Sequence, residues 1–485
     1  MKDPAADAFV RAAASALTKG DAQQALSLAM SGLSAHRDHP QLLVIAGVAH
    51  LHQGATDKAE TSLRTACEIE PRNSDALYNL AFLREQKGDL EGALALYSQT
   101  LEQQPNHLAA LFNSGNAFKG LHQFERAQEQ YRSVLALAPH PQAHKNLGII
   151  AMESGHMADA EQHFRAGLSL VEDPDIRSYL GFSLLAQEQF AEGWQHYEAR
   201  LEAKGNAAVP LVSGLQTWNC EPVNELLILS EEGIGDVIMF ASVLTEVLSL
   251  CNRATLVADA RLHPLFARSF GAKLTLRHTA TEIMAGDFDA QIALASCMRH
   301  FRPSKDSFAA TSAGYLCVDD AMKQALRENL KQDSQGSLIV GVSWMSVNKE
   351  TGADRSLRLV ELAQALSPEG CSLVSLQYGD IDNELAEALA CGHPVYREPM
   401  IDATNDLDGL ASLVAACDVV VSIDNSTVHI TGAIGQDQII LLPFSPSWRW
   451  GLQRETSLLY EKTRLLRQAS PGDWSCLSGL GTALY

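Results

Sequence analysis

A turn of small and polar residues near the middle of the chain is the first place where residue types and spacing could support chemistry. Gly233, Gly235 and Asp236 follow a short apolar run, residues 226–229, in the stretch LLILSEEGIGDVIMFAS. After the turn, apolar residues recur at the spacing of one buried helical face. A strand, a glycine turn and a helix in this order form a βα unit, which presents ligands at the carboxyl end of its strand.

Asp236 has two interpretations at the start of this predicted helix. As an N-cap it would accept first-turn N–H bonds and contribute about 1 kcal/mol, and spacing alone favours this role. As a general base it would take a proton from a reacting hydroxyl, with Glu231 and Glu232 as the other carboxylates of the turn. The glycines allow a sharp turn and a close approach to a bound group. The turn is not a dinucleotide fingerprint, because the third glycine is replaced by bulky residues near Phe240.

A second polar cluster follows the apolar run VVVSI at residues 419–423. Helix N-termini present N–H groups and the positive end of a dipole, which suits a phosphate. Cap chemistry explains one or two of the polar residues here, so we interpret the whole cluster as a ligand site. The predicted ligand residues are Asp424, Asn425, Ser426, Thr427 and His429.

Two more loops at predicted strand ends carry polar side chains. The loop of residues 344–355 offers Lys349 and Arg355, either of which suits a phosphate, although a solvated loop charge is an equal alternative for each alone. Gln377, in the loop QYGD, is a candidate for a base or ribose contact.

Length and composition limit the classes of protein that fit. A chain of 485 residues should hold two to four domains, and its net charge of −21 argues against nonspecific binding to nucleic acid or anionic lipid. Nine scattered cysteines without a C-x-x-C pair indicate a reducing cytoplasm and no structural zinc. Neither a signal peptide nor a membrane-spanning run is expected. Two D-x-D matches, at 287–289 and 380–382, are expected by chance among 58 acidic residues, so no metal or other cofactor is predicted.

The first 200 residues repeat. A small residue recurs every 34 residues and then at steps of 33, in the series Ala25, Ala59, Ala93, Ala127, Ala160 and Gly193. An aromatic residue follows four positions after each of the last four members, at Tyr97, Tyr131, Phe164 and Tyr197. Prolines recur with the same 34-residue step, at Pro71, Pro105 and Pro139. A small residue lets two antiparallel helices approach, and the large one fills the groove between them. These columns resemble the tetratricopeptide repeat, in about six copies.

Repeat arrays of this kind hold an extended partner rather than carry out chemistry. Asn79, Asn113 and Asn146 lie at near-equal spacing on the first helices of successive repeats. They are candidates for hydrogen bonds to the backbone of an acceptor peptide. The alternative is that they are solvated polar positions.

From residue 226 onward, short apolar runs alternate with helical patterns, which is typical of parallel α/β sheets. The predicted strands are 226–229, 255–258, 273–276, 291–295, 338–344, 372–377, 419–423 and 439–443. The predicted organisation is a repeat array at 1–204, a linker at 205–224, and two α/β lobes at 225–332 and 338–485. Two such lobes imply a cleft in which a ligand contacts both.

The carboxy-terminal half resembles the ADP-heptose type of glycosyltransferase, the lipopolysaccharide heptosyltransferase superfamily, which has the two-lobed GT-B fold. The resemblance is carried by EEGIGDVIMFAS (231–242), VVVSIDNSTVHITGAIG (419–435) and LLPFSPSWRWGLQR (441–454). It implies an acceptor-side first lobe and a nucleotide-sugar donor lobe after it. It also implies that Asp236 is the general base, that Asp424, Asn425 and His429 bind phosphate, and that Lys349 or its rival Arg355 holds the donor pyrophosphate.

A repeat array joined to such a module is similar in architecture to bacterial protein glycosyltransferases, including those that modify flagellin. The resemblance therefore implies metal-independent transfer of a sugar from a nucleotide sugar to a Ser or Thr hydroxyl of a protein, such as flagellin, held by the array. Three alternatives remain: a non-catalytic scaffold with a degenerate transferase domain, a nucleotide-sugar epimerase, and a transferase acting on lipopolysaccharide or another glycan. The intact polar loops argue against the scaffold, and an epimerase has no need of a peptide-holding array.

Overall fold

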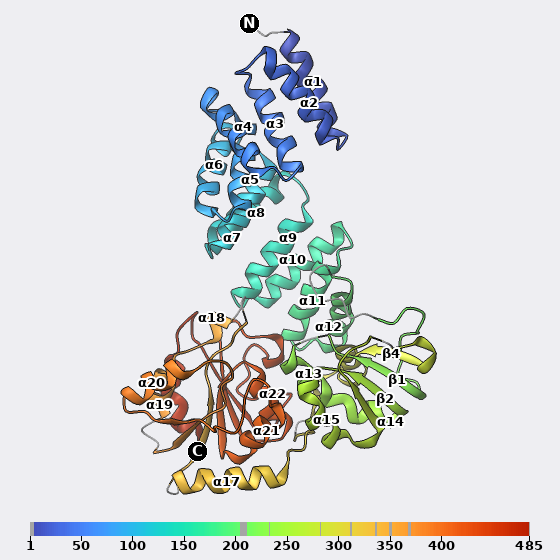
Figure 1. The fold of residues 1–485 in the computed structure, drawn as a ribbon, viewed down its shortest axis with the longest axis vertical. Helices are drawn as coiled ribbons and strands as arrows, with labels where there is room; N and C mark the ends of the chain where they lie inside the picture. Colours follow the sequence, from blue (N-terminus) through green and yellow to red (C-terminus); the bar gives the residue numbers. More distant parts are fainter. Residues whose placement is uncertain are drawn as a thin grey trace. The chain divides into compact units, whose positions relative to one another are not determined.

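The computed structural model describes residues 4–203, 211–231, 233–281, 283–310, 313–334, 337–348, 352–366 and 370–484. The chain forms two compact units (Figure 1). The first comprises Met1–Ala151 and Gln162–Glu172, and the second comprises Met152–Glu161 and Asp173–Tyr485. The last helix pair before the α/β region, at residues 174–197, thus belongs to the second unit.

Antiparallel helix pairs make up the amino-terminal part of the chain. They are α1 (Pro4–Thr18), α2 (Ala22–Ala35), α3 (Pro40–His52), α4 (Thr56–Ile69), α5 (Ser74–Gln86), α6 (Leu90–Gln103), α7 (Leu108–Gly120), α8 (Phe124–Leu137), α9 (Pro141–Glu153) and α10 (Met157–Leu170). The helical repeat array that the sequence predicts is confirmed.

The repeating residues form the contacts between paired helices. The column residues Ala59, Ala93 and Ala127 are fully buried. The rings of Tyr97 and Tyr131, four positions after Ala93 and Ala127, are also fully buried. A Cβ atom added to Gly115 of α7 would lie 2.7 Å from the Tyr131 ring of α8. The ring therefore needs a residue without a side chain on the opposite helix. Gly115 is not part of the predicted columns.

The long segment of the second unit begins with α11 (Pro174–Ala186), α12 (Phe190–Tyr197) and the 3₁₀ turn η1 (Glu198–Leu201). A four-stranded parallel sheet follows, in the order β3-β2-β1-β4. Its strands are β1 (Val223–Leu229), β2 (Cys251–Val257), β3 (Leu274–Arg277) and β4 (Ala290–Ala293). Its helices are α13 (Ile234–Phe240), α14 (Leu244–Ser249), α15 (His263–Phe270) and α16 (Met298–Phe301).

A six-stranded parallel sheet follows, in the order β10-β9-β8-β5-β6-β7. Its strands are β5 (Ile339–Ser343), β6 (Ser372–Ser375), β7 (Val395–Tyr396), β8 (Val419–Ile423), β9 (Gln438–Leu442) and β10 (Thr463–Arg467). The associated helices are α17 (Asp320–Ser334), α18 (Gly352–Arg355), α19 (Leu359–Leu366), α20 (Asp382–Ala390), α21 (Leu407–Ala416), α22 (Ser426–Ala433) and α23 (Leu480–Leu484). Every residue of β5, β8 and β9 is buried, as expected for parallel strands covered on both faces. A region of parallel sheets after the array is therefore confirmed.

A large hydrophobic core in the second unit includes Trp194 of α12, Phe240 of α13 and Val428 of α22, so residues next to both sheets and the last helix pair share it. A separate core includes Val340 of β5 and Val421 of β8. The helices α13 and α22, one beside each sheet, are in packed contact. The cleft between two lobes stays a prediction. Among the described residues, no helix is long and apolar enough to cross a membrane.

Candidate functional site

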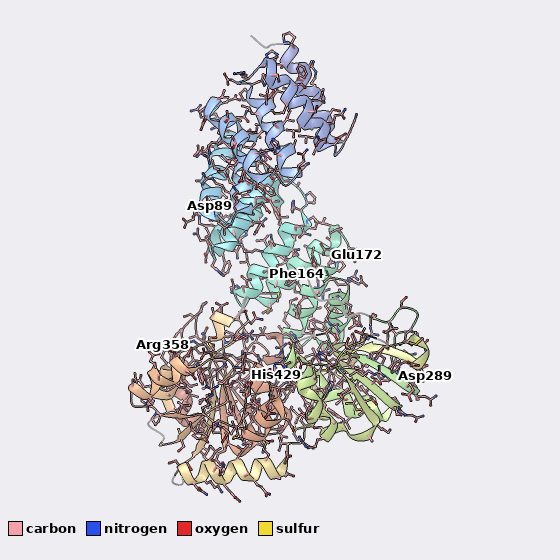
Figure 2. All side chains as sticks on the ribbon, viewed as in Figure 1. Asp89, Phe164, Glu172, Asp289, Arg358 and His429 are labelled. Carbon is pink, nitrogen blue, oxygen red and sulfur yellow. The ribbon has the colours of Figure 1, made fainter. Side chains whose placement is uncertain are left out.

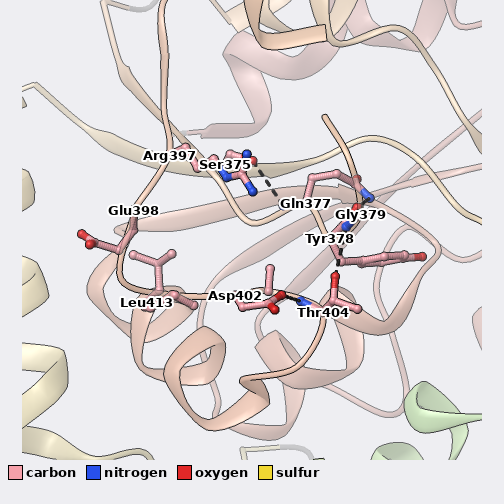
Figure 3. Close-up of a pocket in the computed structure, with 11 residues that line it drawn as sticks. Ser375, Gln377, Tyr378, Gly379, Arg397, Glu398, Asp402, Thr404 and Leu413 are labelled. Atoms are coloured by element: carbon pink, nitrogen blue, oxygen red, sulfur yellow. Dashed lines mark hydrogen bonds between the residues drawn. The ribbon is translucent and has the colours of Figure 1, made fainter. Parts of the chain in front are cut away.

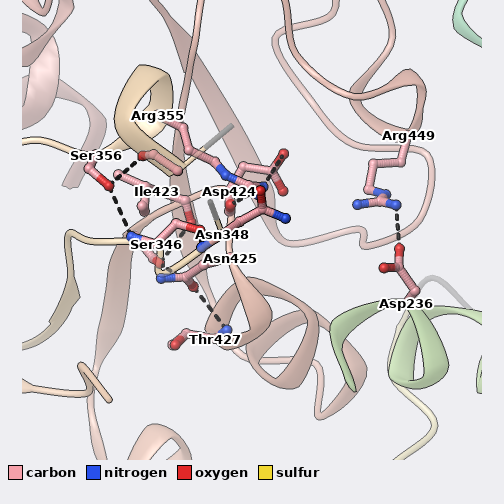
Figure 4. Close-up of polar contacts among 12 residues, drawn as sticks. Asp236, Ser346, Asn348, Arg355, Ser356, Ile423, Asp424, Asn425, Thr427 and Arg449 are labelled. Atoms are coloured by element: carbon pink, nitrogen blue, oxygen red, sulfur yellow. Dashed lines mark hydrogen bonds and ion pairs between the residues drawn. The ribbon is translucent and has the colours of Figure 1, made fainter. Parts of the chain in front are cut away.

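Asp236 lies in the first turn of α13 and is not its cap. The helix begins at Ile234 and its N-cap is Gly233, so the predicted cap role of Asp236 is wrong. The Asp236 carboxylate instead forms an ion pair with Arg449, from the turn η9 (Trp448–Trp450). Figure 4 shows the two side chains pointing toward each other. Both are largely buried, with 24% and 15% of the side chains exposed, so the attraction is screened less than at a protein surface.

Gly235 lies where α13 and α22 approach each other too closely for a side chain. A Cβ atom at this position would lie 2.9 Å from His429 Cδ2 and 3.3 Å from Ser426 Cα, both in α22. The first turns of α13 and α22 are therefore in direct contact. The carboxyl ends of β1 and β8, which precede these helices, are brought to the same place.

Asn425 forms hydrogen bonds that link the start of α22 to the end of β5. It is the N-cap of α22, and its Oδ1 accepts a bond from the Thr427 N–H at 3.0 Å. Its Nδ2 donates to Ser343 Oγ at 2.8 Å and to the Met345 carbonyl at 3.3 Å. Thr427 is fully buried behind it, whereas Ser426 is partly exposed. Two of the predicted phosphate ligands, Asn425 and Thr427, thus hold the site together.

Asp424 and Arg355 form the second charged pair. Arg355 Nη1 donates to the Asp424 carbonyl at 2.9 Å and lies 3.8 Å from Asp424 Oδ2 (Figure 4). The Asp424 side chain is only 3% exposed, and that of Arg355 is 18% exposed. The structure therefore places Arg355 beside the Asp424 turn. Donor binding by these residues stays a prediction. Lys349 and Glu232 lie outside the described residues.

His429, labelled in Figure 2, is a buried residue of α22 and is 2% exposed. Its Nδ1 lies 2.9 Å from the Tyr460 hydroxyl, and its ring stacks on Trp450 with centroids 5.6 Å apart. Burial lowers the pKa of His429 well below its usual value, and the positive charges of Arg449 and Arg355 lower it further. His429 can therefore offer a hydrogen bond to a ligand, but it does not supply a positive charge near neutral pH.

This depressed pKa predicts a pH-dependent stability that is lost in His429→Gln. Below pH 6.5 the unfolded chain takes up a proton at His429 and the folded chain does not, so the free energy of unfolding falls as the pH falls. By pH 5.5 the loss from this residue is at most about 1.4 kcal/mol relative to pH 7.5, the limit set by protonation of the unfolded chain. Denaturant unfolding of parent and variant at both pH values, followed by tryptophan fluorescence, measures it. A parent-minus-variant difference that is the same at both pH values would contradict the prediction.

The side chain of Gln377 is hydrogen-bonded to backbone groups that follow β5 and β6. Its Oε1 accepts bonds from Ser343 Oγ (3.0 Å) and from the N–H groups of Trp344 and Met345 (both 2.9 Å). Its Nε2 donates to the carbonyls of Met345 and Tyr378, at 3.1 Å each. Both amide protons of Gln377 are used in these bonds. The predicted contact of Gln377 with a base or ribose stays a prediction, and a hydrogen bond donated to that ligand would replace one of them.

A small pocket lies beside Gln377 (Figure 3). Its volume is about 20 Å³, which is room for about one water molecule. The polar side chains in its lining are Ser375, Gln377, Tyr378, Arg397, Glu398, Asp402 and Thr404. As it stands, the pocket is too small for a nucleotide base.

Two residues of the site carried no prediction, Arg449 and Tyr460. Arg449 lies within the segment LLPFSPSWRWGLQR, and an arginine between two tryptophans is a usable signal, because a buried guanidinium requires a partner. Tyr460 has no comparable signal in the sequence. Glu231, the alternative base, is paired with the buried Arg200 and its side chain is 6% exposed, so it is not available to a substrate.

The three asparagines of the array are not equivalent. Asn79 donates to the carbonyl of Asp75 at 2.7 Å, and Asn113 donates to the Tyr78 hydroxyl at 3.2 Å. Asn146 is 7% exposed and donates to Asn116 Oδ1 at 2.9 Å and to the Tyr131 hydroxyl at 3.0 Å. Asn146 therefore belongs to a buried network rather than to a peptide-binding row, and peptide contacts by Asn79 and Asn113 stay predictions.

Comparison with known proteins identifies the repeats. Models of the tetratricopeptide repeat match residues 50–114, 10–74 and 112–175. Protein FlbA of Caulobacter vibrioides (strain ATCC 19089 / CIP 103742 / CB 15) is 29% identical over 277 residues, which cover 53% of this chain and 46% of FlbA. The chain thus spans about half the length of the curated relative it matches.

Solved structures also resemble parts of the chain. PilW, a widely conserved type IV pilus biogenesis factor, is 21% identical with a TM-score of 0.38, covering 41% of this chain and 94% of that one. MamA is 18% identical with a TM-score of 0.30, covering 32% and 92%. The family models, rather than these structures, establish that the amino-terminal region is a tetratricopeptide-repeat array, a class that presents extended binding surfaces to protein partners.

Proposed function

We propose that this protein is a glycosyltransferase that moves a sugar from a nucleotide sugar to a Ser or Thr hydroxyl of a protein acceptor held by the repeat array. The observation that carries the proposal is the contact between the first turns of α13 and α22, with the Asp236–Arg449 pair beside one and the Asp424–Arg355 pair beside the other. Parallel α/β sheets bind ligands at the carboxyl ends of their strands, where both turns lie. Two carboxylate–arginine pairs beside these turns provide a proton acceptor and positive charge, which suit the transfer of a sugar away from a phosphate.

The proposed reaction is a single displacement. The acceptor oxygen attacks the anomeric carbon of the sugar, and its proton passes to the Asp236 carboxylate. The bond between that carbon and the donor phosphate breaks, and the phosphate leaves with the electron pair. Arg355, Arg449 and the first-turn N–H groups of α22 stabilise its charge, so that these groups supply the positive charge without a metal or cofactor.

The ion pair with Arg449 holds the Asp236 carboxylate in place in the first turn of α13. An incoming donor phosphate competes for the Arg449 guanidinium and weakens this pair. Binding of the donor therefore releases the Asp236 carboxylate to contact the acceptor hydroxyl.

A non-catalytic scaffold is the second candidate function. Two observations favour it: Gln377 is fully engaged with the backbone, and His429 is neutral and bonded to Tyr460. In that case the repeat array would bind the partner, and the polar residues of the α/β part would serve its fold.

Transfer to a purified acceptor separates the two functions. Full-length protein is incubated with flagellin, proposed as acceptor from the architecture, and with a panel of nucleotide sugars. Intact mass spectrometry should show an increase of one or more sugar residues with one donor. Binding of flagellin without a mass increase for any donor would favour the scaffold.

Arg355→Gln is expected to weaken binding of the donor nucleotide. A charge-assisted hydrogen bond contributes about 1.5–3 kcal/mol, so its loss raises the dissociation constant by about 10- to 150-fold. Calorimetry with nucleoside diphosphates measures this change. Arg358→Gln is the matched control, because Arg358 is three residues away, 61% exposed, and paired with Glu387 outside the site. Equal dissociation constants for both variants would mean that Arg355 does not hold the phosphates.

A further inference from the structure

The loop that carries Arg449, residues 444–454, is tied at three points to helices that precede the α/β region. Ser445 Oγ donates to the carbonyl of Met152, near the end of α9, at 2.7 Å. Arg454 forms an ion pair with Glu188, in the turn between α11 and α12. Between these ties, the ring of Trp448 meets the ring of Trp194, in α12.

Trp194 is a fixed support for this loop. It is 1% exposed, and its indole N–H donates to the carbonyl of Arg302 at 2.8 Å. Arg302 is itself held by two 2.8 Å bonds to the carboxylate of Glu246. The ring of Trp194 meets Trp448 edge to face, with centroids 5.2 Å apart and planes at 87°. This is the favourable geometry for an aromatic pair and leaves Trp448 little freedom.

Trp448 in turn contacts the arginine that follows it. The Arg449 guanidinium lies 5.8 Å from the centroid of the Trp448 ring and reaches the Asp236 carboxylate. On the other side, Trp450 stacks on His429. Arg449 therefore lies between Trp448, which packs on Trp194 of α12, and Trp450, which packs on His429 of α22.

We infer that Trp194 is a positioning residue, which acts through Trp448 to hold Arg449 against Asp236. The last helix pair, α11 and α12, thereby belongs to the machinery of the site as well as to the repeat pattern. The placement of Arg449 follows from the contacts alone, whereas its effect on the rate of transfer rests on the proposed function.

The chain offers a matched control for Trp194→Phe. Trp218 is also 1% exposed, and its indole N–H also donates to a backbone carbonyl, that of Glu221, at 2.8 Å. Its aromatic neighbour is Phe301, outside the Arg449 loop. Trp218→Phe therefore removes a comparable ring and hydrogen bond from the same unit. A second variant, Glu188→Gln, weakens a different tie of the loop at a more exposed position.

The test is the reactivity of Arg449 toward phenylglyoxal in the full-length protein, measured by peptide mass spectrometry. The reference is Arg253, whose side chain is 67% exposed. Trp194→Phe should make Arg449 react about 2- to 10-fold faster relative to Arg253, the factor that corresponds to loss of an edge-to-face aromatic pair. Glu188→Gln should change it in the same direction, and Trp218→Phe should leave it unchanged. If Trp194→Phe does not fold, Glu188→Gln decides the test.

Equal Arg449 reactivity in the parent and both loop variants would overturn the inference, as would an equal increase in Trp218→Phe. If transfer is observed, the loop variants should lower kcat per folded molecule while the KM for the acceptor stays within about 2-fold, and Trp218→Phe should leave kcat near the parental value. If reactivity changes as expected but no donor is ever used, the positioning role stands and the proposed function fails.

Discussion

Asp236→Asn is expected to lower the rate of sugar transfer by about 10²- to 10⁴-fold, the usual contribution of a general base. Asparagine keeps an oxygen that can accept a bond from Arg449, and the helix start is unaffected because Gly233 is the N-cap. It cannot take a proton from the acceptor hydroxyl. Single-turnover transfer, followed by the mass of the acceptor, measures the loss, and calorimetry shows whether the donor still binds.

The variant also weakens an ion pair, so this effect needs a control of its own. Asp418→Asn provides one, because Asp418 is paired with Arg327 and its side chain is 29% exposed, close to the 24% of Asp236. Asp418 precedes β8, whereas Asp424 follows it, so Asp418 lies at the opposite end of the strand from the site. We expect near-parental transfer from Asp418→Asn.

Near-parental transfer by Asp236→Asn, with intact stability, would remove Asp236 as the base. Glu231 is a poor substitute, because the guanidinium of Arg200 occupies it inside the fold. Transfer that falls equally in Asp236→Asn and Asp418→Asn would indicate a general loss of stability in the second unit rather than loss of a base.

The repeat array and the strands could be predicted because their patterns are local. Each repeat buries a small residue between its two helices, so small residues recur every 34 positions and are visible in the sequence. Each predicted strand overlaps a strand of the structure. The clearest are β5, β8 and β9, because a strand buried on both faces is a nearly continuous apolar run. The strands β7 (Val395–Tyr396) and β10 (Thr463–Arg467) were missed, because the first is very short and the second contains two arginines.

The partners within the candidate site could not be predicted, because they are distant in the sequence. Arg449 and Asp236 are 213 residues apart, and no local pattern links them. Gly235 was interpreted as leaving space for a ligand, whereas its contact with His429 shows that it leaves space for a helix. Asn146 follows Asn113 at nearly the same interval at which Asn113 follows Asn79, yet its side chain is buried and hydrogen-bonded to Asn116 and Tyr131.

The last helix pair also has contacts that its sequence pattern does not reveal. Gly193 and Tyr197 continue the columns of the array. Trp194 and Arg200, however, contact Arg302 and Glu231 of the first α/β lobe. A fragment that begins after residue 204 would lack both residues and expose the surfaces they cover. Separate expression of the α/β region should therefore begin before α11.

Arg200→Ala is expected to destabilise the second unit by about 3–5 kcal/mol, the usual cost of removing one partner of a buried ion pair. Arg200 is 2% exposed and bonds to the Glu231 carboxylate, to Ser296 Oγ at 3.0 Å, and to Glu198 Oε1 at 3.0 Å. Without the guanidinium, the Glu231 charge stays in the interior without its main compensation, and the space left by the side chain adds to the loss.

Tryptophan fluorescence makes this loss measurable in a chain with two units. All six tryptophans lie at or beyond residue 194, within the second unit, so their signal is insensitive to unfolding of the first. The denaturant midpoint of this transition should fall sharply in Arg200→Ala. The double variant Arg200→Met with Glu231→Met should regain most of the loss, because an apolar pair of similar volume often replaces a buried ion pair without cost. A double variant as unstable as Arg200→Ala would mean that the bonds to Ser296 and Glu198, rather than the Glu231 charge, account for the stability that Arg200 provides.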